Sequence, residues 1–221
     1  MKLVLVSPPG ERSNEVAVVE RLFDSGLERY HLRKPGWDSH RVAVWLETLS
    51  ARWRGRVFLH SHADLARTFR VGGIHFRDDG DIPSDFALRV PAECLTSRSC
   101  HDVVAVKAAL GRYDSIFFGP VFPSFSKPGY GPVPAPVLEE LRAVLLPRNP
   151  AKKCTQALAI GGVTPNSLEI CRALGFDGVA TLGAVWNASD PVGAFLEFRS
   201  ASLRKTENTS SDRIPPQCTH H

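Results

Sequence analysis

The 221-residue sequence lacks several features that mark special classes of protein. No apolar stretch approaches the roughly 20 residues that a membrane-spanning helix needs. The apolar run near the N-terminus is broken by Ser7-Pro8-Pro9 and is too short for a signal peptide. The five cysteines are an odd number without a close pair typical of zinc or redox motifs. We therefore expect free thiols and a cytoplasmic protein that contacts no membrane.

An excess of charge of either sign is also lacking. The sequence has 27 Lys and Arg residues against 23 Asp and Glu residues, scattered along the chain. Nucleic-acid binding usually needs basic residues gathered on one face, and we expect no such partner. Because 43% of the residues are hydrophobic, burial can offset the entropy of ordering the chain, which excludes disorder of its bulk.

Short apolar runs alternate with amphipathic segments. Several of the runs are apolar on both faces, as strands buried on two sides of a parallel sheet are. The predicted strands cover residues 3–7, 29–33, 56–60, 73–76, 93–97, 115–120, 157–161 and 178–182. The first helical pattern follows residue 13, and we expect Ser13 to be its N-cap and Gly26 its left-handed C-terminal cap.

About eight strands alternating with about eight helices predict an α/β fold, a single (β/α)₈ TIM barrel of parallel strands over residues 1–204. An open doubly wound sheet is the alternative. Residues 205–221 lose the apolar period and are predicted to form a disordered tail.

Active sites of such barrels lie where the strands end. The second predicted strand ends at Arg33, whose guanidinium can bind a phosphate through two hydrogen bonds. Lys34 points to the opposite side and is expected to be structural. After the sixth strand, Ser124, Ser126 and Lys127 stand among prolines and glycines. Hydroxyl groups with a nearby ammonium predict an oxyanion-binding loop, with a solvated surface loop as the alternative.

Two glycine-containing turns follow the seventh and eighth strands. Gly161 and Gly162 end the seventh, and Thr181-Leu182-Gly183 ends the eighth. Loops at these places commonly bind phosphate through backbone N–H groups. Together with the loop after the sixth strand, they predict two phosphorylated small-molecule substrates or one with a phosphate at each end.

Three histidines, His60, His62 and His75, lie near the ends of the third and fourth strands. Their spacing matches no known zinc pattern, so buried structural histidines are expected, with a transition-metal site as the alternative.

Acidic and hydroxyl side chains follow the next strand ends. Asp79 and Asp81 carry the hard oxygen atoms that Mg²⁺ prefers. Ser99 and His101 follow the fifth predicted strand, where they either contact substrate or cap the next helix.

Taken in their order along the sequence, these motifs resemble those of the thiamine phosphate synthase/TenI family over about residues 3–200. The segments that carry the resemblance are Arg33, 73–75, 99–101, 119–127, 159–165 and 178–180. The resemblance implies a transferase that joins an aminopyrimidine methyl diphosphate to a thiazole phosphate or its carboxylate. The products are thiamine phosphate and pyrophosphate, and Mg²⁺ is the cofactor.

The resemblance also implies roles for individual residues. The loop that holds pyrophosphate in the family corresponds to Ser124, Ser126 and Lys127. The family's arginine on strand two corresponds to Arg33. The thiazole phosphate lies against the turns after strands seven and eight, at Gly161, Gly162, Thr181 and Leu182. Ser99 and His101 are expected to contact substrate.

Some family positions carry other residues here. The Gln and Lys on either side of the strand-two arginine are His31 and Pro35. His31 is therefore expected to contact substrate. The Asn-Asp pair after strand three is His60-Ser61, and the second metal-binding Asp aligns with Gly80. Asp79 and Asp81 are the candidates to replace the missing ligands.

Two alternatives come from the same family. Its thiazole tautomerases use a histidine directly after the strand-six glycine, where this chain has Pro120. Other members are phosphate-ligand-binding homologues without catalysis. The sequence is compatible with a monomer and with a homo-oligomer.

Overall fold

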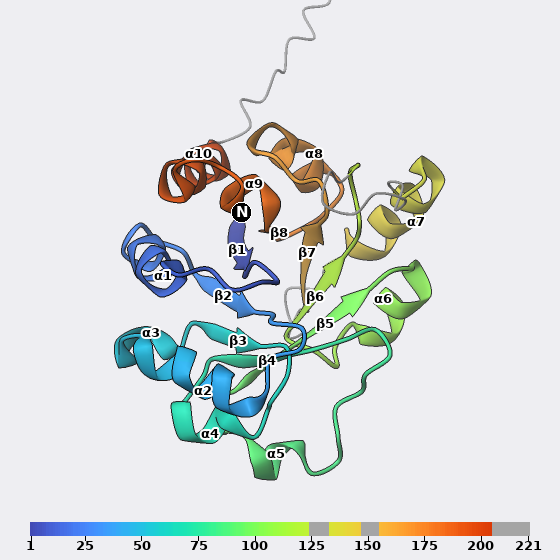
Figure 1. Cartoon of the computed structure of the whole chain (residues 1–221). Coiled ribbons are helices and arrows are strands. Elements are labelled where there is room, and N and C mark those ends of the chain that lie inside the picture. Colours follow the sequence, from blue (N-terminus) through green and yellow to red (C-terminus); the bar gives the residue numbers. More distant parts are fainter. Residues whose placement is uncertain (124–132, 147–154, 205–221) are drawn as a thin grey trace, which may run out of the picture.

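The computed structural model describes residues 1–123, 133–146 and 155–204. Eight parallel strands form a closed barrel in sequence order, in which β1 pairs with both β2 and β8 (Figure 1). This closure confirms the predicted (β/α)₈ barrel, because an open doubly wound sheet would not pair β1 with β8. The strands are β1 (Lys2–Val6), β2 (Arg29–Leu32), β3 (Val57–Leu59), β4 (Gly73–Phe76), β5 (Leu95–Cys100), β6 (Ser115–Phe118), β7 (Gln156–Ile160) and β8 (Gly178–Thr181).

Helices surround the barrel and carry the chain from the end of one strand to the start of the next (Figure 1). In the described residues they are α1 (Glu15–Asp24), α2 (Ser39–Thr48), α3 (Ala51–Arg54), α4 (Leu65–Phe69), α5 (Phe86–Arg89), α6 (Val103–Ala109), α7 (Ala135–Leu145), the 3₁₀ helix η1 (Pro165–Ser167), α8 (Leu168–Ala173), α9 (Gly183–Trp186) and α10 (Pro191–Leu203). None of the described helices has the length and apolarity needed to cross a membrane. Cys94, Cys100 and Cys171 are free, while the other two cysteines and the predicted tail, residues 205–221, lie outside the described residues.

Alternation along the strands divides the buried side chains into two layers. On β1, Leu3 and Leu5 belong to the large core between sheet and helices, and Val4 and Val6 belong to a smaller cluster inside the barrel. The smaller cluster is completed by residues of β6, β7 and β8, namely Phe117, Leu158 and Ala180. One side of the barrel interior is therefore apolar.

The largest difference from the predicted strands is at β5. The prediction ended this strand at residue 97, but β5 runs to Cys100, so Ser99 lies within the strand. The polar residues of this segment suggested a loop. They are accommodated because the hydroxyls of Ser97 and Ser99 form hydrogen bonds with the His75 ring inside the barrel.

The helix caps were predicted in part. Gly26 has φ +95°, which confirms the left-handed cap after α1. Ser13 as N-cap is wrong, because the cap position is Asn14, whose Oδ1 accepts a hydrogen bond from Arg12 Nε. The cap of α6 is Asp102, whose side chain accepts from Ala105 N at 2.7 Å.

A buried ion pair holds the loop after β1 against the end of β2. Lys34 Nζ lies 2.5 Å from Glu15 Oε2 and donates to the carbonyl oxygens of Pro8 and Gly10 at 2.8 Å each. The Tyr30 hydroxyl donates to Glu15 Oε1 at 2.8 Å. Both charged side chains are nearly inaccessible, at 1% and 3% exposure. The structural role predicted for Lys34 is confirmed.

Loss of one charge from this pair should destabilise the fold strongly. Glu15→Gln keeps the shape of the side chain but leaves the Lys34 ammonium buried without a counterion, which costs about 3–5 kcal/mol of unfolding free energy. Urea denaturation measures the loss. The control is Glu11→Gln, which removes an exposed ion pair with Arg41 and should cost less than about 1 kcal/mol. Equal losses in the two variants would contradict the role assigned to the buried pair.

Candidate active site

The ends of β1 and β2 together fix the position of Arg33. Ser7 Oγ accepts a hydrogen bond from Arg33 N at 2.8 Å and donates to Arg33 O at 2.9 Å. The Arg33 side chain is exposed, while the next residue, Lys34, points into the buried ion pair described above. This alternation leaves the Arg33 guanidinium at the end of the strand, where it is accessible to an anion.

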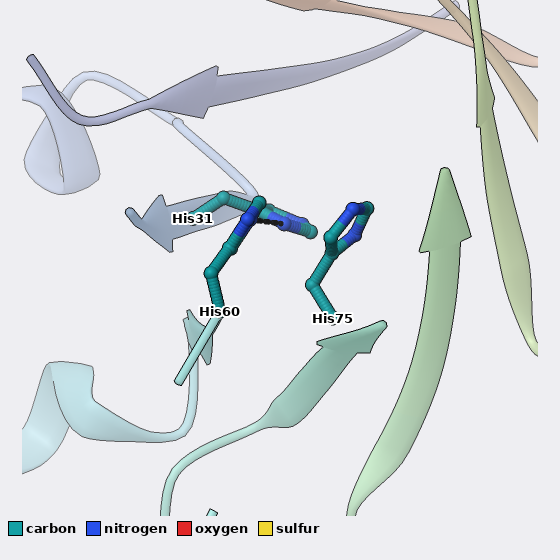
Figure 2. Close-up of side chains that lie close together, drawn as sticks. All are labelled: His31, His60 and His75. Atoms are coloured by element: carbon teal, nitrogen blue, oxygen red, sulfur yellow. Dashed lines mark hydrogen bonds between the residues drawn. The ribbon is translucent and has the colours of Figure 1, made fainter. Parts of the chain in front are cut away.

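Three histidines meet inside the barrel at the ends of neighbouring strands (Figure 2). His31 lies on β2, His60 directly follows β3, and His75 lies on β4. His31 Nδ1 and His60 Nε2 are 3.1 Å apart, and the rings of His60 and His75 stack with centroids 4.0 Å apart. One nitrogen from each ring can be chosen so that all three lie within 4.8 Å of one another.

Aromatic rings and hydroxyl groups surround this cluster. His31 stacks on Phe58 with centroids 4.7 Å apart and lies against Phe117 at 4.6 Å. His75 Nδ1 is 2.6 Å from Ser97 Oγ, and His75 Nε2 is 2.9 Å from Ser99 Oγ. The polar groups of the interior thus lie on the β2–β5 side, next to the apolar cluster contributed by β1 and β6–β8.

The three imidazoles are held neutral. Burial, with a smaller effect of the nearby Arg33 guanidinium, lowers the pKa of His75 to about 3. Burial also lowers the pKa of His31 and of His60 well below the usual range for histidine, and the neighbouring rings of the cluster add to the shift. Neutral imidazole is the form that binds metal ions and exchanges hydrogen bonds with polar ligands.

The glycine turn after β7 packs against the segment that follows β6. Val121 N donates to Ile160 O at 2.9 Å, and Phe122 N donates to Gly161 O at 3.1 Å. Gly161 has φ +91° and Gly162 has φ +64°. A Cβ on Gly162 would lie 2.2 Å from the carbonyl oxygen of Pro123. The turn therefore needs glycine for its backbone conformation and for this close approach.

Residues 119–123, which lie along the turn, lead directly to the hydroxyl-rich loop predicted to bind an anion. Its residues Ser124, Ser126 and Lys127 lie outside the described residues. Their roles stay predictions.

The end of β8 reaches the same interior. Thr181 is the last residue of the strand and is buried, and Leu182 packs against the apolar cluster inside the barrel. Substrate contacts by Thr181 and Leu182 stay predictions.

The polar groups after β4 and β5 pair with one another and with cations. Asp79 lies 3.4 Å from Arg77 Nε, and Asp81 accepts hydrogen bonds from Arg112 at 2.9 Å and from the Tyr113 hydroxyl at 3.0 Å. These bonds lower the pKa of Asp81. Both carboxylates are exposed and already bound to positive or donor groups.

His101 and Ser99, predicted as a pair, separate in the structure. His101 Nδ1 donates to Gly119 O at 2.7 Å, which links the segment after β5 to the end of β6. Ser99 instead contacts His75 inside the barrel. Since Asp102 caps α6, helix capping by Ser99 and His101 is wrong.

The grouping of histidines also differs from the sequence-based one. His62 is separate, and its Nε2 donates to Trp37 O at 2.8 Å. His31 takes its place beside His60 and His75. The signal was in the alternation of β2, because Tyr30 and Leu32 belong to the outer core and His31 must then face inward.

Comparison with known proteins shows the family of the chain. The sequence model of the family described as thiamine monophosphate synthase matches residues 3–185. A thiamine-phosphate synthase of Chromobacterium violaceum is 30% identical over 200 residues, which cover 87% of this chain and 91% of that protein. One from Prochlorococcus marinus (strain MIT 9313) is 29% identical over 207 residues, which cover 90% of this chain and 56% of that protein. The chain thus spans only about half the length of some curated relatives.

Solved structures show the same likeness. The thiamine phosphate pyrophosphorylase of Bacteroides thetaiotaomicron superposes with a TM-score of 0.73 at 26% identity, covering 91% of this chain and 98% of that one. A 3-hexulose-6-phosphate synthase, at 14% identity and a TM-score of 0.62, shares the fold. Because the family model covers most of the described barrel, the chain belongs to the thiamine monophosphate synthase family.

Proposed function

We propose that the chain is a thiamine phosphate synthase, a transferase that joins an aminopyrimidine methyl diphosphate to a thiazole phosphate. The observation that carries the proposal is the close packing of residues 119–123 along the Gly161–Gly162 turn. This contact brings the start of one predicted anion-binding loop beside the other. A reaction between two phosphorylated substrates needs such neighbouring sites.

The main role of the protein in this reaction is to stabilise the charge of the leaving group. The bond between the pyrimidine methyl carbon and the diphosphate oxygen breaks, and its electron pair leaves with pyrophosphate. The lone pair of the thiazole nitrogen then forms the new carbon–nitrogen bond. No protein nucleophile is needed, because cations and hydrogen-bond donors around the leaving group lower the barrier. Arg33 and Lys127 are the proposed cations, and Ser124 and Ser126 the proposed donors.

The Mg²⁺ predicted for this reaction was assigned to Asp79 and Asp81. Their contacts with Arg77, Arg112 and Tyr113 do not fit that assignment, because a metal ion would have to displace these partners. We assign no step to Mg²⁺ at these residues. The cytoplasmic location and the oligomeric state stay predictions.

The direct test is formation of thiamine phosphate from the two precursors with Mg²⁺ present, followed by chromatography. We expect turnover by the unaltered chain, and a decrease of tens to thousands-fold in Lys127→Ala, as is typical when a charged stabiliser of the leaving group is lost. Lys107→Ala is the matched control, since Lys107 pairs with Glu140 on the outer helices. Binding of both precursors without product would identify the chain as a non-catalytic binding homologue instead.

The glycine turn gives a second test. Gly162→Ala should weaken binding of the thiazole phosphate and lower unfolding free energy by about 1–3 kcal/mol, because Cβ meets the backbone of residues 122–123 and φ is positive. Calorimetric titration and thermal unfolding measure the two effects. At Gly55 an added Cβ has nothing within 4 Å, so Gly55→Ala should change neither. Unaltered thiazole phosphate binding by Gly162→Ala would remove the turn from the substrate site.

A further inference from the structure

We propose that His31, His60 and His75 bind one divalent transition-metal ion of the zinc class, with a fourth coordination position open to solvent or to an anionic oxygen. The function proposed above assigns no step to these three side chains, and the substrate contact expected of His31 stays a prediction. Among residues 1–123, 133–146 and 155–204, they are the one group of three or more potential metal ligands close enough together for a single ion.

The spacing of the ring nitrogens suits such an ion. Two imidazole nitrogens bound to tetrahedral zinc at about 2.0–2.1 Å lie about 3.3–3.4 Å apart. His31 Nδ1 and His60 Nε2 are 3.1 Å apart, close to that value. The three ligand nitrogens, one from each ring, all lie within 4.8 Å of one another. Histidine χ2 is broadly distributed, so ring rotation can bring the third nitrogen inward.

Ser97 supplies the type of contact that orients a metal-binding histidine. Its fully buried hydroxyl lies 2.6 Å from His75 Nδ1. When Nδ1–H donates to this oxygen, Nε2 is unprotonated and can bind a metal ion. Ser99 Oγ, 2.9 Å from Nε2, is the group that a metal ion would replace.

His31 presents one defined nitrogen to the cluster. Its side chain is fully buried, and Nδ1 faces His60 Nε2 at 3.1 Å. A single proton lies between those two rings when they are neutral, and an ion bound by both nitrogens would take its place. The other ring nitrogen of His31, Nε2, has no hydrogen-bond partner among the described residues and points away from this ion position.

Exposure also favours a metal ion with an open position. His31 and His75 are buried, whereas His60 is partly exposed, so solvent reaches the cluster from the His60 side. Sites with three protein ligands and one open position are typical of catalytic rather than structural zinc.

The test uses the full-length protein, freed of metal with a chelator and titrated with Zn²⁺ by calorimetry and with Co²⁺ by visible absorption. We expect one ion per chain and the intense absorption bands of tetrahedral Co²⁺. His31→Gln and His60→Asn should each weaken binding by more than 100-fold, because each removes a ligand. Ser97→Ala should weaken it by about 10–100-fold through loss of orientation.

Two controls separate this site from other histidines. His62→Gln changes the neighbouring histidine that bonds to Trp37, and the double variant His220→Ala/His221→Ala removes the terminal pair. Both should bind Zn²⁺ like the unaltered chain. Thermal unfolding without metal shows that each variant is folded; His60→Asn is the decisive variant if His31→Gln does not fold, because His60 is partly exposed.

Three results would overturn the proposal. They are a failure of the unaltered chain to bind either ion, equal binding by the folded ligand variants, and loss of binding in the terminal double variant. Because no substrate is used, these results are independent of the proposed synthase activity, and an inactive chain that binds Zn²⁺ at the cluster would still support the metal site.

Discussion

The pairing of β1 with β8 is the constraint on which the rest of the structure depends. By closing the sheet, it forces alternate residues of all eight strands into one interior. The register then decides which side chains meet: Val6 is opposite His31, His31 opposite Phe58, and His75 opposite Ser97. His31 and His75, 44 positions apart in the sequence, become neighbours because β2 and β4 both pair with β3 in this curved, closed sheet.

The interior is divided into an apolar half and an imidazole half, and the division has an energetic basis. Buried charge would be costly without a partner, and the histidines avoid that cost by staying neutral. The buried charges of Lys34 and Glu15 lie instead outside the strands, paired with each other. The end of the barrel at β2 therefore presents one exposed cation, Arg33, beside neutral rings. An anion that approaches this end would meet the positive charge of Arg33, because the neighbouring histidine rings carry no negative charge.

Sequence reasoning predicted the barrel and most of its strands, because strand runs buried on both faces have a clear pattern. It also predicted that Lys34 would face away from Arg33, which needs only the alternation of an extended chain.

Sequence reasoning failed where contacts between strands decide the outcome. The end of β5 was missed because the polar Ser97 and Ser99 are stabilised by a histidine on another strand. His31 was not grouped with His60 and His75 because that contact depends on register. The anion-binding roles of Ser124, Ser126 and Lys127 rest on composition and family resemblance, since these residues lie outside the described ones.

The central claim is that two phosphorylated groups bind side by side at the carboxyl ends of the strands. A crystal structure of the chain with thiazole phosphate and pyrophosphate tests it most directly. The account predicts the thiazole phosphate against the Gly161–Gly162 turn and pyrophosphate within reach of Arg33 at the same end of the barrel. Electron density for either anion at the opposite end of the strands, or on the outer helices alone, would contradict it.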